Sequence, residues 1–217
     1  MMVGRREVLA WLDALQQIYA ENRGFLTELD SAIGDADHGV NMDRGFSAVR
    51  DELLAGAPQD LGDLFKGVAM ILIRTVGGAA GPLYGTLFLR AAAVCAGKAE
   101  LGAPDVVSLF RAGIEGVQQR GKAVPGDKTM VDALLPALEA MQSALGNGGG
   151  LSEVLAAGVA AAEKGMKATV PLQARKGRAS YLGPRSIGHQ DPGASSSYLL
   201  LKAAADSFRQ SEAPRST

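Results

Sequence analysis

Apolar residues recur at steps of three and four positions along most of the chain, a spacing that puts side chains on one face of an α-helix. The first stretch of this kind has an apolar face made of Val8, Trp11, Leu12, Leu15, Ile18 and Tyr19. No alternating run rich in Val, Ile or Thr predicts a strand, and no segment repeats at a fixed period. The pattern therefore predicts an all-α protein.

Start and stop residues divide the rest of the pattern into further helices. Asp60 and Asp127 are side chains suited to cap a helix N-terminus, and Pro82 and Pro104 suit the first turn of a helix. The further helices are expected from about Gly24 to the break at residues 33–39, over residues 42–56, from Asp60, from Pro82, from Pro104, from Asp127, from about Ser152 to Ala168, and from Asp191 to near Phe208. The sum is about eight helices packed as one layered bundle, with a polar, glycine-rich loop over residues 169–190.

Composition agrees with this fold class and limits the possible partners. The chain has 217 residues and is 47% apolar, and much of that fraction is alanine and leucine, which favour helices over sheets. We expect one domain over residues 1–210 and a disordered tail over residues 211–217. The formal net charge is −1, so no global basic field indicates direct binding to nucleic acid or to an anionic membrane.

Nothing in the sequence indicates export or insertion into a membrane. The first residues superficially resemble a signal peptide, but Glu7 and Asp13 interrupt the apolar run and its periodicity is amphipathic. The longest uncharged stretch in the middle, residues 75–89, is too short and too glycine-rich to span a bilayer. A lone cysteine, Cys95, excludes an internal disulfide and is expected to be an inert core residue. We therefore expect a cytoplasmic protein.

The segment LDSAIGDADHGVNM, residues 29–42, crowds Asp30, Asp35 and Asp37 together. Like charges repel, so this crowding costs free energy unless a cation lies among them. An EF-hand is excluded, because Val40 and Phe46 stand where its glycine and glutamate are required. Solvated capping aspartates are the simpler interpretation. However, carboxylates without cysteine or paired histidines suit Mg²⁺, which completes its octahedron with water and phosphates, and we predict such a site.

Two other segments place glycines at expected helix ends. Residues 75–85, TVGGAAGPLYG, lack the Gly-Lys-Ser/Thr of a Walker A loop, and their glycines would also permit close helix packing. Gly81 and Pro82 would nevertheless open a helix whose free backbone N–H groups form an anion site. Residues 120–133, RGKAVPGDKTMVDA, are mostly explained by capping, with Gly121 ending one helix and Asp127 and Thr129 starting the next.

A fourth segment, QARKGRASYLGPRSIGHQDPGASSS at residues 173–197, is basic in an otherwise balanced chain. Its cationic residues are Arg175, Lys176, Arg178 and Arg185. A solvated basic loop is one interpretation. Beside a metal-binding acidic loop, the better interpretation is that these cations neutralise phosphates during transfer.

Together, GDADHGVNMDRGF, VGGAAGPLYGT, GKAVPGDKTMVDA and ARKGRASYLGPRSIGHQDPGA resemble the nucleotide-binding L subunits of bacterial dihydroxyacetone kinases, from about residue 7 to residue 205. The resemblance implies an eight-helix antiparallel up-down barrel that binds ADP or ATP through two Mg²⁺ ions on Asp30, Asp35 and Asp37. It also implies residues that surround the nucleotide: His38, Gly39, Val40, Asn41, Ala79, Ala80, Gly121, Met130, Arg178, Asp191, Pro192 and Gly193. Many relatives have serine where this chain has Ala80, so backbone N–H groups would have to contact phosphate there.

The implied activity is that of a phosphotransferase in glycerol metabolism. Phosphoryl transfer needs mainly positioning and charge neutralisation, and Arg178 would be the catalytic residue that offsets charge on the moving group. The sequence offers no convincing general base. This absence agrees with the family scheme, in which a separate K subunit binds dihydroxyacetone covalently through a histidine.

The phosphoryl donor and the wider partners stay open. In one version, ADP remains bound and a phosphohistidine-carrying subunit of the phosphoenolpyruvate-dependent phosphotransferase system rephosphorylates it. In the other, ATP exchanges from solution, as in a two-subunit triose or tetrose kinase. We favour the first version, because the chain matches the stand-alone subunit from end to end. A non-catalytic co-regulator of a transcription factor is the alternative of another class, and a homodimer is expected.

Overall fold

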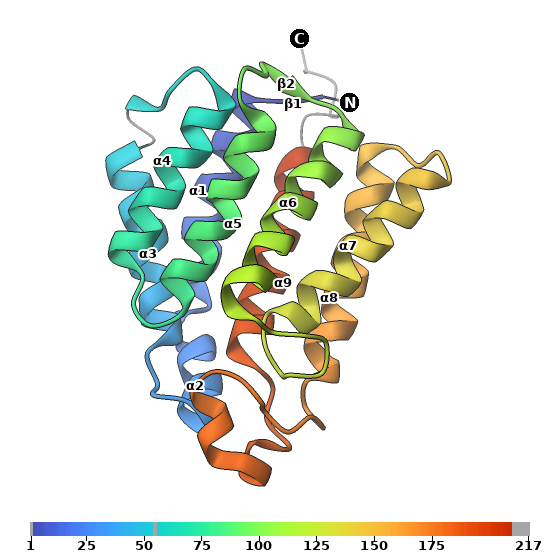
Figure 1. The fold of residues 1–217 in the computed structure, drawn as a ribbon. Coiled ribbons are helices and arrows are strands. Elements are labelled where there is room, and N and C mark those ends of the chain that lie inside the picture. Colours follow the sequence, from blue (N-terminus) through green and yellow to red (C-terminus); the bar gives the residue numbers. More distant parts are fainter. Residues whose placement is uncertain (1, 54–55, 210–217) are drawn as a thin grey trace.

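The computed structural model describes residues 2–53 and 56–209 (Figure 1). These residues form nine α-helices and one 3₁₀-helix, with a single pair of short strands. The α-helices are α1 (Arg5–Glu21), α2 (Arg23–Ile33), α3 (His38–Leu53), α4 (Leu61–Thr75), α5 (Ala80–Cys95), α6 (Ala103–Gly121), α7 (Val131–Gly146), α8 (Leu151–Ala168) and α9 (Pro192–Arg209), and the 3₁₀-helix is η2 (Arg178–Ser186). The all-α class is confirmed, and the expected tail over residues 211–217 lies outside the described residues.

The long helices lie beside one another in a cyclic order. α3 packs on α4, and each later helix packs on the next as far as α9, which contacts α1, which in turn contacts α3 (Figure 1). α2 follows α1 after the single residue Asn22 and lies at the lower end of the helices in Figure 1, near η2. The closed eight-helix barrel stays a prediction, which this order of contacts supports.

A short antiparallel strand pair lies at the end opposite α2. β1 (Val3–Gly4) pairs with β2 (Glu100–Leu101), with Val3 opposite Leu101 (Figure 1). The sequence did not predict these strands, because two residues are too short for an alternating pattern to register. Among the described residues, no helix is both long enough and apolar enough to cross a membrane.

Several of the expected helix starts are confirmed. The Asp60 carboxylate accepts a hydrogen bond from the backbone N–H of Asp63, at 3.0 Å, and caps α4. Pro82 lies in the first turn of α5, and Pro104 lies in the first turn of α6. The expected helix from about Ser152 to Ala168 is α8, and the expected last helix is α9.

Three expectations about where helices lie are wrong. Asp127 does not cap α7, because its carboxylate accepts from the backbone N–H of Val124 and the helix begins only at Val131. The third helix begins at His38 rather than at residue 42, because Asp30 supplies the capping oxygen. The stretch over residues 169–190 is not all loop, since it contains η2.

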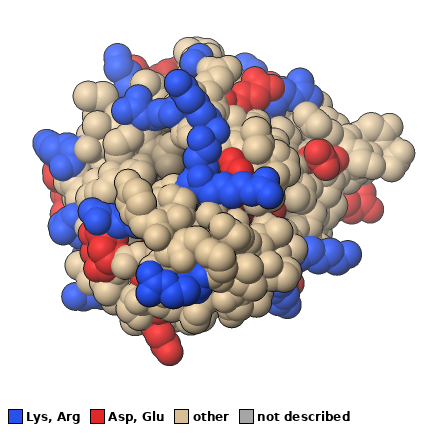
Figure 2. Space-filling model, turned by 60° about the horizontal axis from the view of Figure 1, so that its bottom comes forward, with Lys and Arg blue, Asp and Glu red and all other residues tan. Residues whose placement is uncertain are grey.

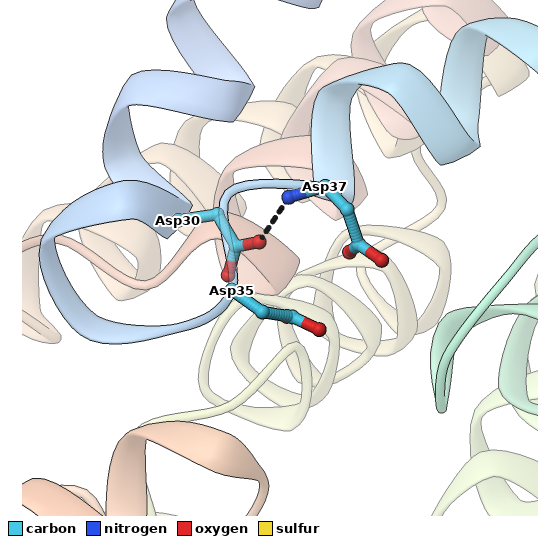
Figure 3. A group of neighbouring side chains, drawn as sticks. All are labelled: Asp30, Asp35 and Asp37. Atoms are coloured by element: carbon cyan, nitrogen blue, oxygen red, sulfur yellow. Dashed lines mark hydrogen bonds between the residues drawn. The ribbon is translucent and has the colours of Figure 1, made fainter.

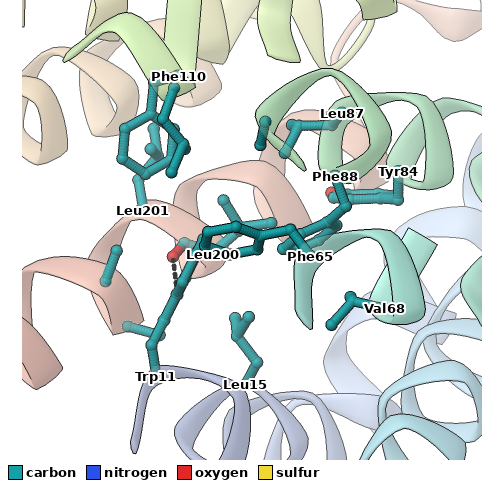
Figure 4. Packing of buried hydrophobic residues seen from close by; sticks show 14 of the residues in the cluster. Trp11, Leu15, Phe65, Val68, Tyr84, Leu87, Phe88, Phe110, Leu200 and Leu201 are labelled. Carbon is teal, nitrogen blue, oxygen red and sulfur yellow. Dashed lines mark hydrogen bonds between the residues drawn. The ribbon is translucent and has the colours of Figure 1, made fainter. Parts of the chain in front are cut away.

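The core is organised around one tryptophan. Trp11 of α1 is fully buried, and its ring packs on four phenylalanines with centroids 5.6 to 6.2 Å away (Figure 4). These partners are Phe65 of α4, Phe88 of α5, Phe110 of α6 and Phe208 of α9. Its indole N–H donates to the carbonyl oxygen of Leu200 at 3.2 Å. One side chain thus joins helices from the whole length of the chain, and the burial of its large apolar surface stabilises their packing.

Candidate functional site

A cleft of about 490 Å³ opens at the lower end of the helices in Figure 1, between the connections that carry the four unusual segments. Figure 2 shows this end of the molecule, where Lys and Arg side chains extend across a hollow that contains acidic atoms. Of the expected site residues, the cleft is lined by Asp30, Asp35, Asp37, His38, Asn41, Ala79, Ala80, Gly121, Met130, Arg178, Asp191, Pro192 and Gly193. Folding therefore gathers segments that are distant in the sequence into one concave site.

Two expected site residues, Gly39 and Val40, do not line the cleft. Gly39 lies in the first turn of α3, where a Cβ atom would stand 2.1 Å from the carbonyl oxygen of Arg23 and 2.5 Å from Oγ1 of Thr27. Glycine is required there because α3 approaches the backbone of α2 so closely. Gly39 therefore serves the packing that carries Asp30 toward the start of α3.

The three aspartates converge. Asp30 lies in the last turn of α2, while Asp35 and Asp37 lie on the connection to α3 (Figure 3). Each offers a carboxylate oxygen, and these oxygens all lie within 4.8 Å of one another. Asp30 is buried, and one of its oxygens accepts from the backbone N–H groups of Asp37, at 2.9 Å, and His38, at 3.1 Å.

The geometry agrees in part with each of the two interpretations of the aspartates, helix capping and a metal site. Asp30 does cap the start of α3, as the simpler interpretation expects. Capping does not explain why the carboxylates of Asp35 and Asp37 point toward the same place. Three carboxylates with no cysteine form a hard-oxygen donor set, which fits Mg²⁺ and leaves positions for water or phosphate oxygens.

Arg178 connects the basic segment to this cluster. It is the first residue of η2, and its Nε lies 2.8 Å from a carboxylate oxygen of Asp35. The arginine side chain is 67% exposed, so the ion pair lies at the mouth of the cleft and can rearrange when an anion binds. Lys176 also lines the cleft, whereas Arg175 and Arg185 do not.

The turn before α5 forms another wall of the cleft. Gly77, Gly78, Ala79 and Ala80 line it, and α5 begins at Ala80 rather than at the expected Gly81. Beside this turn, the amide oxygen of Asn41 accepts a hydrogen bond from Arg44, whose Nε also donates to the carbonyl oxygen of Thr75 at 2.8 Å. Asn41 also lines the cleft, where an amide N–H group is a suitable donor. Helix N–H groups and amide donors suit an anionic ligand.

His38 has a different environment from the one the sequence suggested. It lines the cleft, but its Nε2 is hydrogen-bonded to the hydroxyl of Ser196 at 2.8 Å. That hydroxyl is also 2.7 Å from the hydroxyl of Tyr84, and Tyr19 donates to the carbonyl oxygen of Ser196 at 2.8 Å. Burial lowers the pKa of His38, against the opposing effect of the nearby aspartates. The sequence gave no sign of this buried polar network, because its members come from four helices.

The start of α9 completes the cleft. Asp191 precedes the helix, as expected, and its carboxylate accepts from the backbone N–H of Ala194 at 2.7 Å. Burial raises the pKa of Asp191 to about 7, against the lowering effect of that hydrogen bond. At Gly193, a Cβ atom would lie 3.1 Å from a carboxylate oxygen of Asp191, so a larger residue there would crowd that carboxylate.

Besides Arg120, sequence reasoning missed a second charged residue of the cleft, Lys128. It lines the cleft, is 1% exposed, and has a left-handed backbone with φ of 61°. Lysine is normally an exposed residue with negative φ, so no sequence signal pointed to this conformation.

The fold and the cleft define an all-α protein with an acidic, cation-compatible site at one end of its helices. The chain belongs to the DAK2 domain family, whose model matches residues 32–206. It is 44% identical to "PEP-dependent dihydroxyacetone kinase, ADP-binding subunit DhaL" of Escherichia coli (strain K12), over 94% of this chain and 98% of that protein. It is 42% identical to "PTS-dependent dihydroxyacetone kinase, ADP-binding subunit DhaL" of Lactococcus lactis, over 89% of this chain and 93% of that protein.

A solved structure has the same fold. It is the dihydroxyacetone kinase from C. freundii in complex with AMP-PNP and Mg²⁺, which is 26% identical, with a TM-score of 0.69 over 92% of this chain. The chain spans 33% of the length of that kinase. The resemblance stated from the sequence is therefore confirmed at the level of the family.

Proposed function

We propose that this protein is the ADP-binding subunit of a dihydroxyacetone kinase, a phosphotransferase. The observation that carries the proposal is the convergence of Asp30, Asp35 and Asp37 beside Arg178 at the mouth of one cleft. The relatives named as DhaL subunits match over nearly their whole length, which supports the same role for residues 1–210 as one domain.

The aspartates would hold the metal ions, two of them according to the family resemblance. Bound Mg²⁺ supplies charge neutralisation for the nucleotide phosphates. Asp30 is held in place by the backbone N–H groups it accepts from, so its oxygens are preorganised. Bound cations would also explain why three carboxylates are tolerated so close together.

The remaining expected residues would bind and orient the nucleotide. Backbone N–H groups at Ala79 and Ala80 and at the start of α9, with the amide of Asn41, would donate to phosphate oxygens. Arg178 would leave Asp35 as phosphate binds and would stabilise the charge that develops during transfer. Met130 and Gly121 would form part of the wall around the nucleotide.

The acceptor substrate would be supplied by a partner. A K subunit that carries dihydroxyacetone, or a related ketose, would dock at the open mouth of the cleft. The names of the relatives support phosphoenolpyruvate as the ultimate donor, so that bound ADP is rephosphorylated in place by a phosphohistidine subunit. Exchange of ATP from solution is the second candidate, favoured by the likeness to a longer kinase solved with AMP-PNP.

The proposal carries three further expectations from the sequence, namely a cytoplasmic location, a homodimer and contact with a transcription factor. All three stay predictions. Light scattering during size-exclusion chromatography distinguishes a monomer from a dimer, and co-purification with the K subunit and with candidate regulators tests the partners.

The test of the site is calorimetry of ADP binding with Mg²⁺ to the wild type and to Asp35→Ala. We expect the variant to lose Mg²⁺-dependent affinity, because one carboxylate of the set is removed. Asp51→Ala is the matched control, since Asp51 is an exposed carboxylate on α3 outside the cleft. Unchanged nucleotide affinity in Asp35→Ala would contradict the metal site.

The donor is tested on protein purified without added nucleotide and dialysed extensively. A resident ADP must dissociate slowly, so we expect it to remain bound and to raise the unfolding temperature. The protein is then given dihydroxyacetone and the K subunit, with either ATP or a phosphohistidine donor system. Empty protein that turns over rapidly with ATP alone would favour the second candidate.

A further inference from the structure

Lys128 has an environment that the proposed function does not use. Its ammonium group is buried and points into a cage of backbone carbonyl oxygens rather than toward a carboxylate. The oxygens within hydrogen-bonding distance belong to Thr169 at 2.9 Å, Val170 at 3.5 Å, Leu172 at 3.1 Å, Ser186 at 2.7 Å and His189. A buried cation without an ion-pair partner is costly, and the carbonyl dipoles are what offset that cost.

The cage joins the stretch just before the basic segment to a later part of that segment. Thr169, Val170 and Leu172 follow the end of α8, whereas Ser186 and His189 lie at and after the end of η2. One ammonium group therefore holds together two stretches of backbone between which Arg178 lies. Removing it would leave several carbonyl oxygens facing one another with no donor between them.

The same lysine fixes this segment to the connection between α6 and α7. Beside Lys128, the carbonyl oxygen of Asp127 accepts from the backbone N–H of Arg175 at 3.0 Å. The hydroxyl of Thr169 accepts from the backbone N–H of Asp191 at 3.0 Å, which links the cage to the start of α9. The connection, the basic segment and the start of α9 thus form one hydrogen-bonded unit around the ammonium group.

We propose that Lys128 is a positioning residue, whose ammonium group acts as a built-in structural cation that holds the basic segment so that Arg178 faces the aspartate cluster. Its effect on turnover rests on the proposed function. Its effect on the order of the segment does not. Lys128 also lines the cleft, but its donors point to the cage, so its role in transfer is exerted through Arg178.

The first test is hydrogen–deuterium exchange of the nucleotide-free protein. In Lys128→Met, which keeps the length of the side chain but removes its charge and donors, backbone amides of residues 169–191 should exchange on the order of tenfold faster. Lys164→Met, an exposed lysine on α8, is the matched control and should leave these amides unchanged. Unchanged exchange of residues 169–191 in a folded Lys128→Met would overturn the proposal.

The second test is a double-mutant cycle on turnover with the K subunit, at a temperature where every variant is folded. Displacement of the arginine should lower kcat of Lys128→Met on the order of 100-fold, with a smaller change in KM. Adding Arg178→Ala to Lys128→Met should then lower kcat little further, because both changes remove the action of Arg178 on the transferred group. Fully additive losses would overturn the positioning role, as would a kcat equal to that of the wild type.

The two proposals fail in different ways. If the wild type shows no transfer activity and no Mg²⁺-dependent nucleotide binding, the proposed function fails, and the exchange measurement still decides the role of Lys128. If Lys128→Met does not unfold cooperatively, Lys128→Gln, which retains a neutral donor, is measured by the same two criteria. Faster exchange of residues 169–191 with non-additive kcat supports the proposal in either variant.

Discussion

The two halves of the molecule are held together by different forces. Around Trp11, helices meet mainly through large apolar rings, and the indole N–H donates one hydrogen bond, to the carbonyl oxygen of Leu200 (Figure 4). Around the cleft, the described contacts run mostly between side chains and backbone. Asp30 accepts from the start of α3 (Figure 3), and Lys128 donates to its carbonyl cage. Apolar packing is nearly direction-independent, whereas each of these hydrogen bonds requires a defined angle and distance.

This difference indicates that the core around Trp11 mainly provides stability and that the cleft provides binding. The core around Trp11 excludes water, and the burial of its apolar rings stabilises the fold. The cleft concentrates like charges, a buried lysine and a buried aspartate, which cost free energy in the absence of a ligand. Changes in the core should therefore alter stability alone, and changes in the cleft should alter function with smaller effects on stability.

The largest effect on unfolding is expected from Trp11→Ala. The substitution leaves a cavity where five helices meet, so the free energy of unfolding should fall by about 3–5 kcal/mol in denaturant titrations. Met70→Ala, at an apolar residue that is 56% exposed, is the control and should change it little. The comparison of the two regions breaks down if folded Trp11→Ala also loses Mg²⁺-dependent affinity for ADP.

A smaller effect is expected from Asp191, and it depends on pH. Its folded pKa of about 7 lies above the ordinary value of 3.8, so the native state holds a proton that the unfolded state has lost. Stability from this carboxyl group is present below pH 4 and is lost as pH rises toward 7. At about 1.4 kcal/mol for each pKa unit, the wild type should lose about 2 kcal/mol relative to Asp191→Asn between pH 5 and pH 7.

The measurement for Asp191 is the difference in unfolding free energy between the two proteins across this pH range, without metal or nucleotide. Taking the difference cancels the contribution of His38, whose lowered pKa gives the opposite slope. The charged groups that act on Asp191 are Lys128, which lowers its pKa, and Asp132 and Asp30, which raise it. Parallel stability curves for the two proteins would show that Asp191 is ionised throughout.

The smallest effect on stability is expected from Arg178→Ala. The ion pair with Asp35 is exposed, so its loss should change the free energy of unfolding by less than about 1 kcal/mol. Turnover with the K subunit should nevertheless fall on the order of 100-fold, because the guanidinium acts on charge that develops during transfer. Ground-state affinity for ADP should change less than kcat. A large loss of affinity with intact kcat would contradict the transition-state role.

The parts of the fold that follow from local rules could be predicted from the sequence. The apolar face of α1, the Asp60 cap and the prolines at the starts of α5 and α6 depend on neighbours within a few residues. The aspartate cluster was also recognisable, because its three members lie on one short connection. Its convergence is confirmed, while the roles of its members as ligands stay predictions.

The features that the sequence did not predict depend on residues far apart in the chain. Lys128 is buried because five carbonyl oxygens from residues 169–189 surround it, and no local rule places a lysine there. His38 is bonded to Ser196, which is 158 positions away. Asp127 was expected to cap a helix because aspartate is a common capping residue. Instead, the carboxylate of Asp132 accepts from the backbone N–H groups of Gly126 and Thr129.

The cyclic order of helices has a consequence for synthesis on the ribosome. α9 lies between α8 and α1, and it provides the carbonyl oxygens that Trp11 and Tyr19 of α1 require. The indole N–H of Trp11 and the hydroxyl of Tyr19 must therefore wait for these acceptors until nearly all of the other helices have been made. The same late helix begins at the cleft, so a nascent chain interrupted before α9 would lack both its closing contacts and one wall of the site. Folding and competence to bind are thereby coupled to the synthesis of a single segment, α9.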